Sequence, residues 1–196
     1  MYKFVINHTF RVNGYRPDNE EEINIIMKFT VFNPAVDDYH MIPETPGNYM
    51  IALKPGSGLP LCPVDYVMPE YNGLKIIYTG IASLNLRKRD YRAHFKGTAG
   101  KSTLRKSLGC FWGYGFIPRD KNHPDNGKVM YSAADEDTLS EWMRNNLLLL
   151  FCPNDDFEST EDRLISEMNP PLNLMKNNNF INHEFRQWLT AQRTKK

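Results

Sequence analysis

A run of basic residues between Asn85 and Lys106 has the composition of a phosphate-binding segment. It contains eight basic side chains and one acid, a local net charge of +7. A helix is predicted from about Ser83 to Phe95, and it would place Arg89, Arg92 and Lys96 on one face. Cations in such a stripe can follow a phosphate backbone, because each neutralised phosphate releases a counterion. The alternative is an ordinary solvated helix face.

Glu161 is a carboxylate on the apolar side of another predicted helix. If Ser159 caps that helix, Glu161 lies in its first turn, with Leu164, Ile165 and Met168 following on the same face. Burying a charge without a partner is costly, so a metal ion or a cationic side chain is expected there. The alternative is an acid that simply suits the helix dipole while its tip reaches water.

Two tyrosines, Tyr49 and Tyr78, each lie near the end of a predicted strand and beside a glycine. Taken singly, buried strand tyrosines indicate core packing. A function for these tyrosines can be inferred only together with the motifs around them.

Three strands and five helices are predicted to position these side chains. The strands cover about residues 48–53, 74–80 and 127–132. Helices are predicted at 83–95 and from 102 to before 109. A third helix is predicted to start at the capping box formed by Thr138 and Glu141 and to include residues 147–150. The fourth runs from Ser159 to before Pro170, and the last covers 184–193. Residues 1–45 form an N-terminal extension with strand signals at 2–6 and 23–32.

Composition excludes several classes of protein. The chain has 196 residues with 24 Lys and Arg against 23 Asp and Glu, so its net charge of +1 rules out bulk-charge coating of nucleic acid. The longest unbroken apolar run, 147–152, is far short of the ~20 residues that span a bilayer. No signal-peptide pattern is visible, and the three cysteines have no CxxC spacing. We therefore expect a cytoplasmic protein without membrane association.

The motifs together resemble the GIY-YIG nucleases in order and context. Gly47-Asn-Tyr49 is followed by Tyr78-Thr-Gly80, then by Leu86-Arg-Lys-Arg89, Glu161-Asp-Arg-Leu-Ile165 and Asn169-Pro-Pro-Leu-Asn173. In that family two motif strands precede an arginine-bearing helix and a helix with a single glutamate. The resemblance covers about residues 46–175 and leaves a helical tail at 176–196. It implies an α+β fold, with a small antiparallel three-stranded central sheet flanked by helices.

The resemblance also implies a role for each motif residue. Tyr49 would be the general base or orient the water, and Tyr78 would hold the water or the scissile phosphate. Arg89 would stabilise the phosphate, Glu161 would bind one divalent ion, Mg²⁺ or Mn²⁺, and Asn173 would support the site. Because a tyrosine is a poor base at its usual pKa of ~10, Tyr49 would need cationic neighbours that favour the phenolate.

Further phosphate or DNA contacts are expected from the side chains around the arginine helix, namely Arg87, Arg92, His94, Lys96, Lys101 and Arg105. Many family members place a histidine four residues after the arginine, where this chain has Ala93. His94 stands one residue further on. Either the helix register is adjusted or Arg92 and His94 have changed roles.

The implied function is a metal-dependent endonuclease acting on DNA, with double-stranded DNA as the expected partner. A type II restriction endonuclease, acting as a homodimer, fits the solitary chain best. The alternatives are a repair or mobile-element nuclease, a catalytically inactive nucleic-acid-binding protein of the same fold, and an interaction domain whose basic helix binds an acidic protein.

Overall fold

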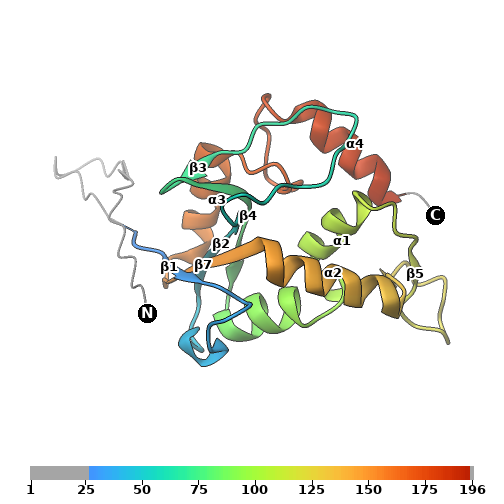
Figure 1. Cartoon of the computed structure of the whole chain (residues 1–196), viewed down its shortest axis with the longest axis horizontal. Coiled ribbons are helices and arrows are strands. Elements are labelled where there is room, and N and C mark those ends of the chain that lie inside the picture. Colours follow the sequence, from blue (N-terminus) through green and yellow to red (C-terminus); the bar gives the residue numbers. More distant parts are fainter. Residues whose placement is uncertain (1–26, 195–196) are drawn as a thin grey trace.

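The structure is a computed structural model that describes residues 27–194. Its elements in chain order are β1 Thr30–Phe32, η1 Tyr39–Met41, β2 Gly47–Leu53, β3 Glu70–Tyr71, β4 Leu74–Ala82, η2 Arg87–Phe95, η3 Ala99–Lys101, α1 Thr103–Cys110, β5 Ile117–Pro118, β6 Val129–Met130, α2 Ala133–Asn146, β7 Leu147–Pro153, α3 Phe157–Met168 and α4 His183–Thr194. Figure 1 shows them along the chain. The α+β class expected from the sequence is confirmed.

The central sheet is antiparallel and has five strands in the order β1-β7-β2-β4-β3. The expectation of three strands was therefore wrong. β1 pairs with β7, so part of the expected N-terminal extension is an edge of the same sheet. The predicted strand at 2–6 lies outside the described residues.

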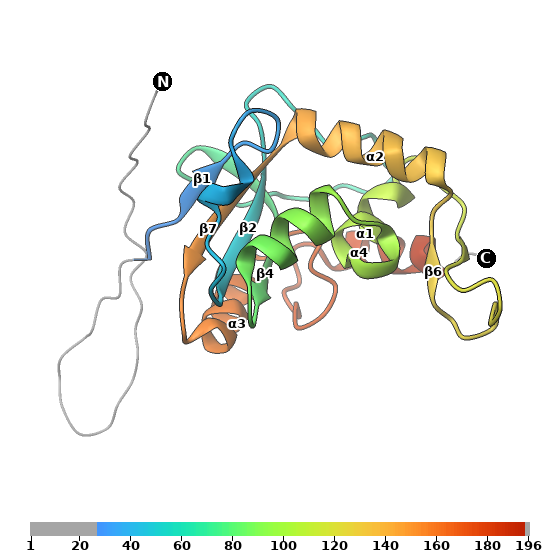
Figure 2. The same ribbon diagram turned by 90° about the horizontal axis from the view of Figure 1, so that it is seen from below.

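Both faces of this sheet are covered. On one face, Tyr49, Ile51 and Leu53 pack in a cluster that also contains residues of η2, α1, α2 and α4. On the other, Met50 and Ala52 pack with residues of α3. Figure 2 shows the strands at one end of the molecule, with α2, α1 and α4 extending towards the β5–β6 hairpin at the other.

The strand β7 replaces what was expected to be the end of a helix. α2 begins after its N-cap Ser132 and stops at Asn146, and Leu147–Pro153 then form a central strand between β1 and β2. Leucine favours helices, and the sequence therefore predicts a helix over this leucine-rich run. A continuous apolar run is, however, typical of a strand that is buried on both faces.

Other helix and strand boundaries also differ from those predicted from the sequence. The segment 127–132 contributes β6 to a separate two-stranded sheet with β5 rather than to the central sheet. α3 starts at Phe157 and ends at Met168, where Asn169 takes a left-handed conformation just before the two prolines. α4 matches the predicted terminal helix, and its Phe185 and Leu189 are fully buried in the core. The C-terminal segment is thus part of the folded unit.

Within residues 27–194, no helix combines the length and the apolar character needed to cross a membrane.

Candidate active site

The motif glycine of β4 makes room for the motif tyrosine of β2. Tyr49 pairs with Gly80 in the antiparallel ladder and is fully buried. A Cβ at residue 80 would lie 2.6 Å from Tyr49 Oη and 2.7 Å from its Cζ. Contacts this short between non-bonded atoms are repulsive, so the tyrosine ring can occupy this position only opposite a glycine.

A bulge in β4 turns the second tyrosine to the same face. Ile76 and Tyr78 face consecutive residues of β2, which leaves Ile77 as an extra residue between them. An inserted residue of this kind re-aims the side chains around it. The rings of Tyr49 and Tyr78 have centroids 6.2 Å apart, and Tyr78 Oη lies 3.2 Å from Thr103 Oγ1 at the start of α1.

His94 reaches Tyr49 because the helix that carries it is a π-helix. η2 covers Arg87–Phe95, and the Lys96 N–H bonds to the carbonyl of Tyr91, five residues earlier. In a π-helix, residues five apart share a face as residues four apart do in an α-helix. His94 Nε2 lies 2.7 Å from Tyr49 Oη. The adjusted helix register thus accounts for the extra residue between Arg89 and His94.

Burial sets the protonation of this pair. It raises the pKa of the Tyr49 hydroxyl well above its ordinary value of 10. Burial also lowers the pKa of His94 well below 6.5, and the charges of Arg89 and Arg105 lower it further. At neutral pH the site therefore contains a neutral phenol bonded to a neutral imidazole. Neighbouring cations do not hold Tyr49 as a phenolate.

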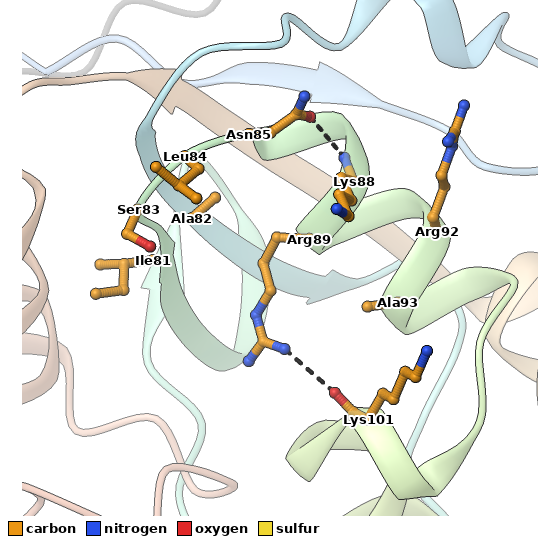
Figure 3. Close-up of a pocket in the computed structure, with 10 residues that line it drawn as sticks. All are labelled: Ile81, Ala82, Ser83, Leu84, Asn85, Lys88, Arg89, Arg92, Ala93 and Lys101. Atoms are coloured by element: carbon orange, nitrogen blue, oxygen red, sulfur yellow. Dashed lines mark hydrogen bonds between the residues drawn. The ribbon is translucent and has the colours of Figure 1, made fainter.

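Four basic side chains surround an open pocket beside this pair. The pocket has a volume of about 470 Å³, and its cationic residues are Lys88, Arg89, Arg92 and Lys101. In Figure 3 the Arg89 guanidinium reaches across the pocket towards Lys101, whose carbonyl accepts a hydrogen bond from it at 3.2 Å. In the part of the chain that the structure describes, no acidic side chain lines the pocket. It is suited to an anionic ligand.

Leu84 also lines this pocket, although it falls within the helix predicted from about Ser83 to Phe95. η2 begins only at Arg87, so Leu84 belongs to the preceding loop and is 81% exposed.

Arg105 does not face the pocket, contrary to its expected role in DNA binding. Its side chain is fully buried, and its Nη2 donates to Glu136 Oε2 at 2.6 Å. Its Nη1 donates to the carbonyl of His94 at 2.9 Å. A buried charge requires such partners. Arg105 therefore supports the helix that carries His94.

Two other basic residues of the segment also have partners within the protein. Arg87 forms an ion pair with Glu44 and donates from Nε to the carbonyl of Ile42 at 2.8 Å. Its side chain is only 17% exposed. The Nζ of Lys96 lies 5.9 Å from the centre of the Tyr91 ring, a cation–π contact at the surface. Arg87 therefore joins η2 to the preceding segment, while Lys96 remains exposed.

Glu161 has the cationic partner that its position on the apolar side of α3 requires. Its side chain is 15% exposed, and Lys176 Nζ lies 3.3 Å from its Oε2. Among the described residues, no three His, Cys, Asp or Glu side chains cluster as a metal site. A divalent ion at Glu161 would thus have at most two protein side chains of these types as ligands. This fits Mg²⁺, which commonly takes one or two carboxylates together with water and substrate phosphate.

Asn173 binds the backbone of the second motif strand. Its Oδ1 accepts from the N–H of Thr79 and its Nδ2 donates to the carbonyl of Thr79, each at 2.9 Å. The amide therefore ties the segment after α3 to the middle of Tyr78-Thr79-Gly80.

Asn48 is a positioning residue that the sequence reasoning missed. It is fully buried, and its Nδ2 donates to the carbonyl of Phe157 at 2.8 Å. Its Oδ1 accepts from Asn154 Nδ2, also at 2.8 Å. These bonds join β2, which carries Tyr49, to the start of α3, which carries Glu161. The signal available in the sequence was a polar residue inside an apolar strand.

The geometry agrees with a comparison against known protein families. Residues 47–195 match the model described as the GIY-YIG catalytic domain. Comparison with curated proteins and with solved structures gives no match.

Proposed function

Because the chain belongs to the family of GIY-YIG catalytic domains, phosphodiester-hydrolysing nucleases, we propose that it is a metal-dependent DNA endonuclease. One observation carries this proposal. Arg89 connects the Tyr49–His94 pair to the cationic pocket, because it lies on the same helix as His94 and its side chain lines the pocket.

Tyr49 and His94 form a relay for a proton. The His94 Nδ1 lies 2.7 Å from Ser102 Oγ. If Nδ1–H donates to that hydroxyl, Nε2 is free to accept from Tyr49. A water that attacks phosphorus then loses its proton to the Tyr49 oxygen as Tyr49 passes its own to His94. The transfer is concerted, so no free phenolate forms, and the imidazolium left on His94 is short-lived because burial and the charges of Arg89 and Arg105 favour loss of that proton.

Arg89 is assigned to the scissile phosphate. A guanidinium offers two parallel donors to phosphate oxygens and keeps its charge at all working pH values. As the P–O3′ bond breaks, negative charge grows on the phosphate oxygens, and a fixed cation there stabilises the transition state. The products are a 5′ phosphate and a 3′ hydroxyl. Tyr78 is assigned to holding the water or the phosphate.

Glu161 is assigned to the divalent ion. When bound, Mg²⁺ or Mn²⁺ supplies Lewis-acid stabilisation at the phosphate. Burial and then the charges of Tyr78 and Asp90 raise the pKa of the Tyr49 hydroxyl, and the charge of Glu161 adds a smaller contribution in the same direction. The charge of Glu161 therefore acts at the Tyr49 hydroxyl, which supports its place in the same site.

Lys88, Arg92 and Lys101 are assigned to the DNA backbone. They line the pocket and are exposed. Lys96 is exposed as well and can contact the flanking backbone. We retain restriction as the biological role and a homodimer as the form that cuts both strands.

Incubating supercoiled plasmid with the protein, with and without Mg²⁺, tests the proposal. We expect nicked or linear plasmid only with the metal, and binding to DNA that weakens steeply as salt rises. Salt-dependent binding without cleavage would instead favour an inactive nucleic-acid-binding member of the family. Absence of both would favour an interaction domain.

A further inference from the structure

Lys176 partly neutralises the carboxylate assigned to the metal. Its Nζ lies 3.3 Å from Glu161 Oε2 and 2.7 Å from Asp162 Oδ1. The Glu161 side chain is mostly buried, whereas the side chains of Lys176 and Asp162 are at least half exposed. The ammonium therefore bridges a sheltered carboxylate and an exposed one.

The backbone holds Lys176 in this position. Its φ is 60°, in the left-handed region that residues other than glycine and asparagine rarely adopt. The chain is anchored on both sides, since the Asn173 N–H and the Asn177 side-chain amide each donate to the carbonyl of Pro170 at 3.2 Å. Such a conformation persists only where the surrounding structure imposes it. This segment thus presents the lysine to α3.

We propose that Lys176 is a positioning residue that weakens binding of the divalent ion at Glu161 until a nucleic-acid phosphate reaches the site. The inference rests on the proposed function. An ammonium at 3.3 Å from the carboxylate competes with a second cation for the same oxygen and repels it. Asp162 gives Lys176 a partner that it keeps when the ion arrives. The phosphate brings the negative charge and the oxygen ligands that offset the repulsion.

The small number of protein ligands makes one lysine sufficient for this effect. No cluster of three metal-binding side chains exists within residues 27–194, so at most one further side chain of these types could share the ion with Glu161. The neighbouring carboxylate of Asp162 is itself paired with Lys176. Binding without substrate then depends on carboxylates whose charge is already partly neutralised. The ion is retained where substrate oxygens complete its shell.

Binding of Mn²⁺ to the full chain without nucleic acid, followed by the electron paramagnetic resonance signal of free Mn²⁺, tests this directly. Lys176→Met keeps the length of the stem and removes the charge. We expect it to bind Mn²⁺ about three- to tenfold more tightly than the wild type. Lys121→Met removes one charge from an exposed residue of another loop and should change nothing. Adding Glu161→Gln to Lys176→Met should abolish the gain.

Three results would overturn the inference. These are equal or undetectable Mn²⁺ binding in wild type and Lys176→Met, an equal gain in Lys121→Met, and a gain that survives Glu161→Gln. Plasmid cleavage by the wild type, measured in parallel, separates this inference from the proposed function. Cleavage that depends on Glu161, with Mn²⁺ affinity unchanged in Lys176→Met, would refute the role of Lys176 alone. A Glu161-dependent gain without any cleavage would refute the nuclease alone.

Discussion

At the scale of single residues, both motif tripeptides carry a polar side chain where the family has isoleucine. Asn48 is bonded to Phe157 and Asn154 at the start of α3. Thr79 is fully buried, and its hydroxyl donates to the carbonyl of Tyr49 at 3.0 Å. Each departure from isoleucine is therefore a hydrogen-bonded connection within the site. A buried polar group with partners is compatible with a well-packed core.

Gly80→Ala tests the close approach of Tyr49 to the motif glycine. The new methyl group would overlap the Tyr49 ring, whose full burial leaves it little room to move. We expect loss of the bond to His94 and a fall in cleavage of about 100-fold, the scale of an ångström-sized misplacement. Denaturation should show a loss of about 1–3 kcal/mol in the free energy of unfolding, so the variant can be assayed folded.

The matched control for this variant is Gly115→Ala. A Cβ there would meet no heavy atom of the described residues within 4 Å. Its activity should equal that of the wild type. Full activity in Gly80→Ala would show that Tyr49 tolerates displacement.

Asp90 gives a prediction for stability as a function of pH. Its carboxyl is fully buried, neither oxygen is hydrogen-bonded to any residue of 27–194, and burial raises its pKa well above the ordinary 3.8. The folded state therefore holds this proton more tightly than the unfolded state. The stability this provides is complete below the unfolded pKa of about 3.9 and is lost as pH rises through the folded value.

Asp90→Asn removes this titration. The free energy of unfolding of Asp90→Asn relative to wild type should therefore increase as pH rises above about 4, and level off above the folded pKa of Asp90. Urea denaturation of both proteins across pH 4–9 measures the difference. A difference that does not vary with pH would show that Asp90 titrates normally.

At the scale of elements, the π-helix η2 decides which side chain meets Tyr49. Arg89 and Ala93 line the pocket, while His94 points into the core. An α-helix over the same residues would bring residue 93, four after Arg89, to the position that His94 now holds. Arg105 and Ser102 then fix the histidine from the next helix, through its carbonyl and its Nδ1.

Exchanging the two residues tests this register. His94→Ala should lower cleavage by about 100-fold, because it removes the acceptor of the Tyr49 proton. Combining it with Ala93→His restores the imidazole at the spacing common in the family, but on the pocket side of η2. We expect the double variant to remain as inactive as His94→Ala. Recovery of activity, measured by plasmid nicking, would mean that the helix can adopt the α register.

At the scale of the whole molecule, the order of the motifs in the sequence was enough to predict the family and the α+β class. It was not enough to predict the number and order of the strands in the sheet. The sequence predicts a helix where β7 lies, because the burial of both faces of this strand cannot be seen in its own residues. One face is covered by α3 and the other by helices that are distant in sequence.

The same limit applies to the charged residues. Arg105 was placed at the surface because its buried partner, Glu136, lies 31 residues away. Conversely, the sequence identifies Tyr49 and Glu161 as site candidates because the other residues of their motifs are adjacent to them in the sequence. Lys176 and Asn48 were not recognised, because their roles depend on contacts between separate elements.

The central claim is that Glu161 belongs to the catalytic site of a nuclease, and a pair of variants in α3 tests it most directly. Nicking of supercoiled plasmid with Mg²⁺ should fall by about 100-fold or more in Glu161→Gln. It should be unchanged in Glu167→Gln, which alters an exposed glutamate of the same helix that faces Arg163 at 3.9 Å. Equal activities of the two folded variants would contradict the account.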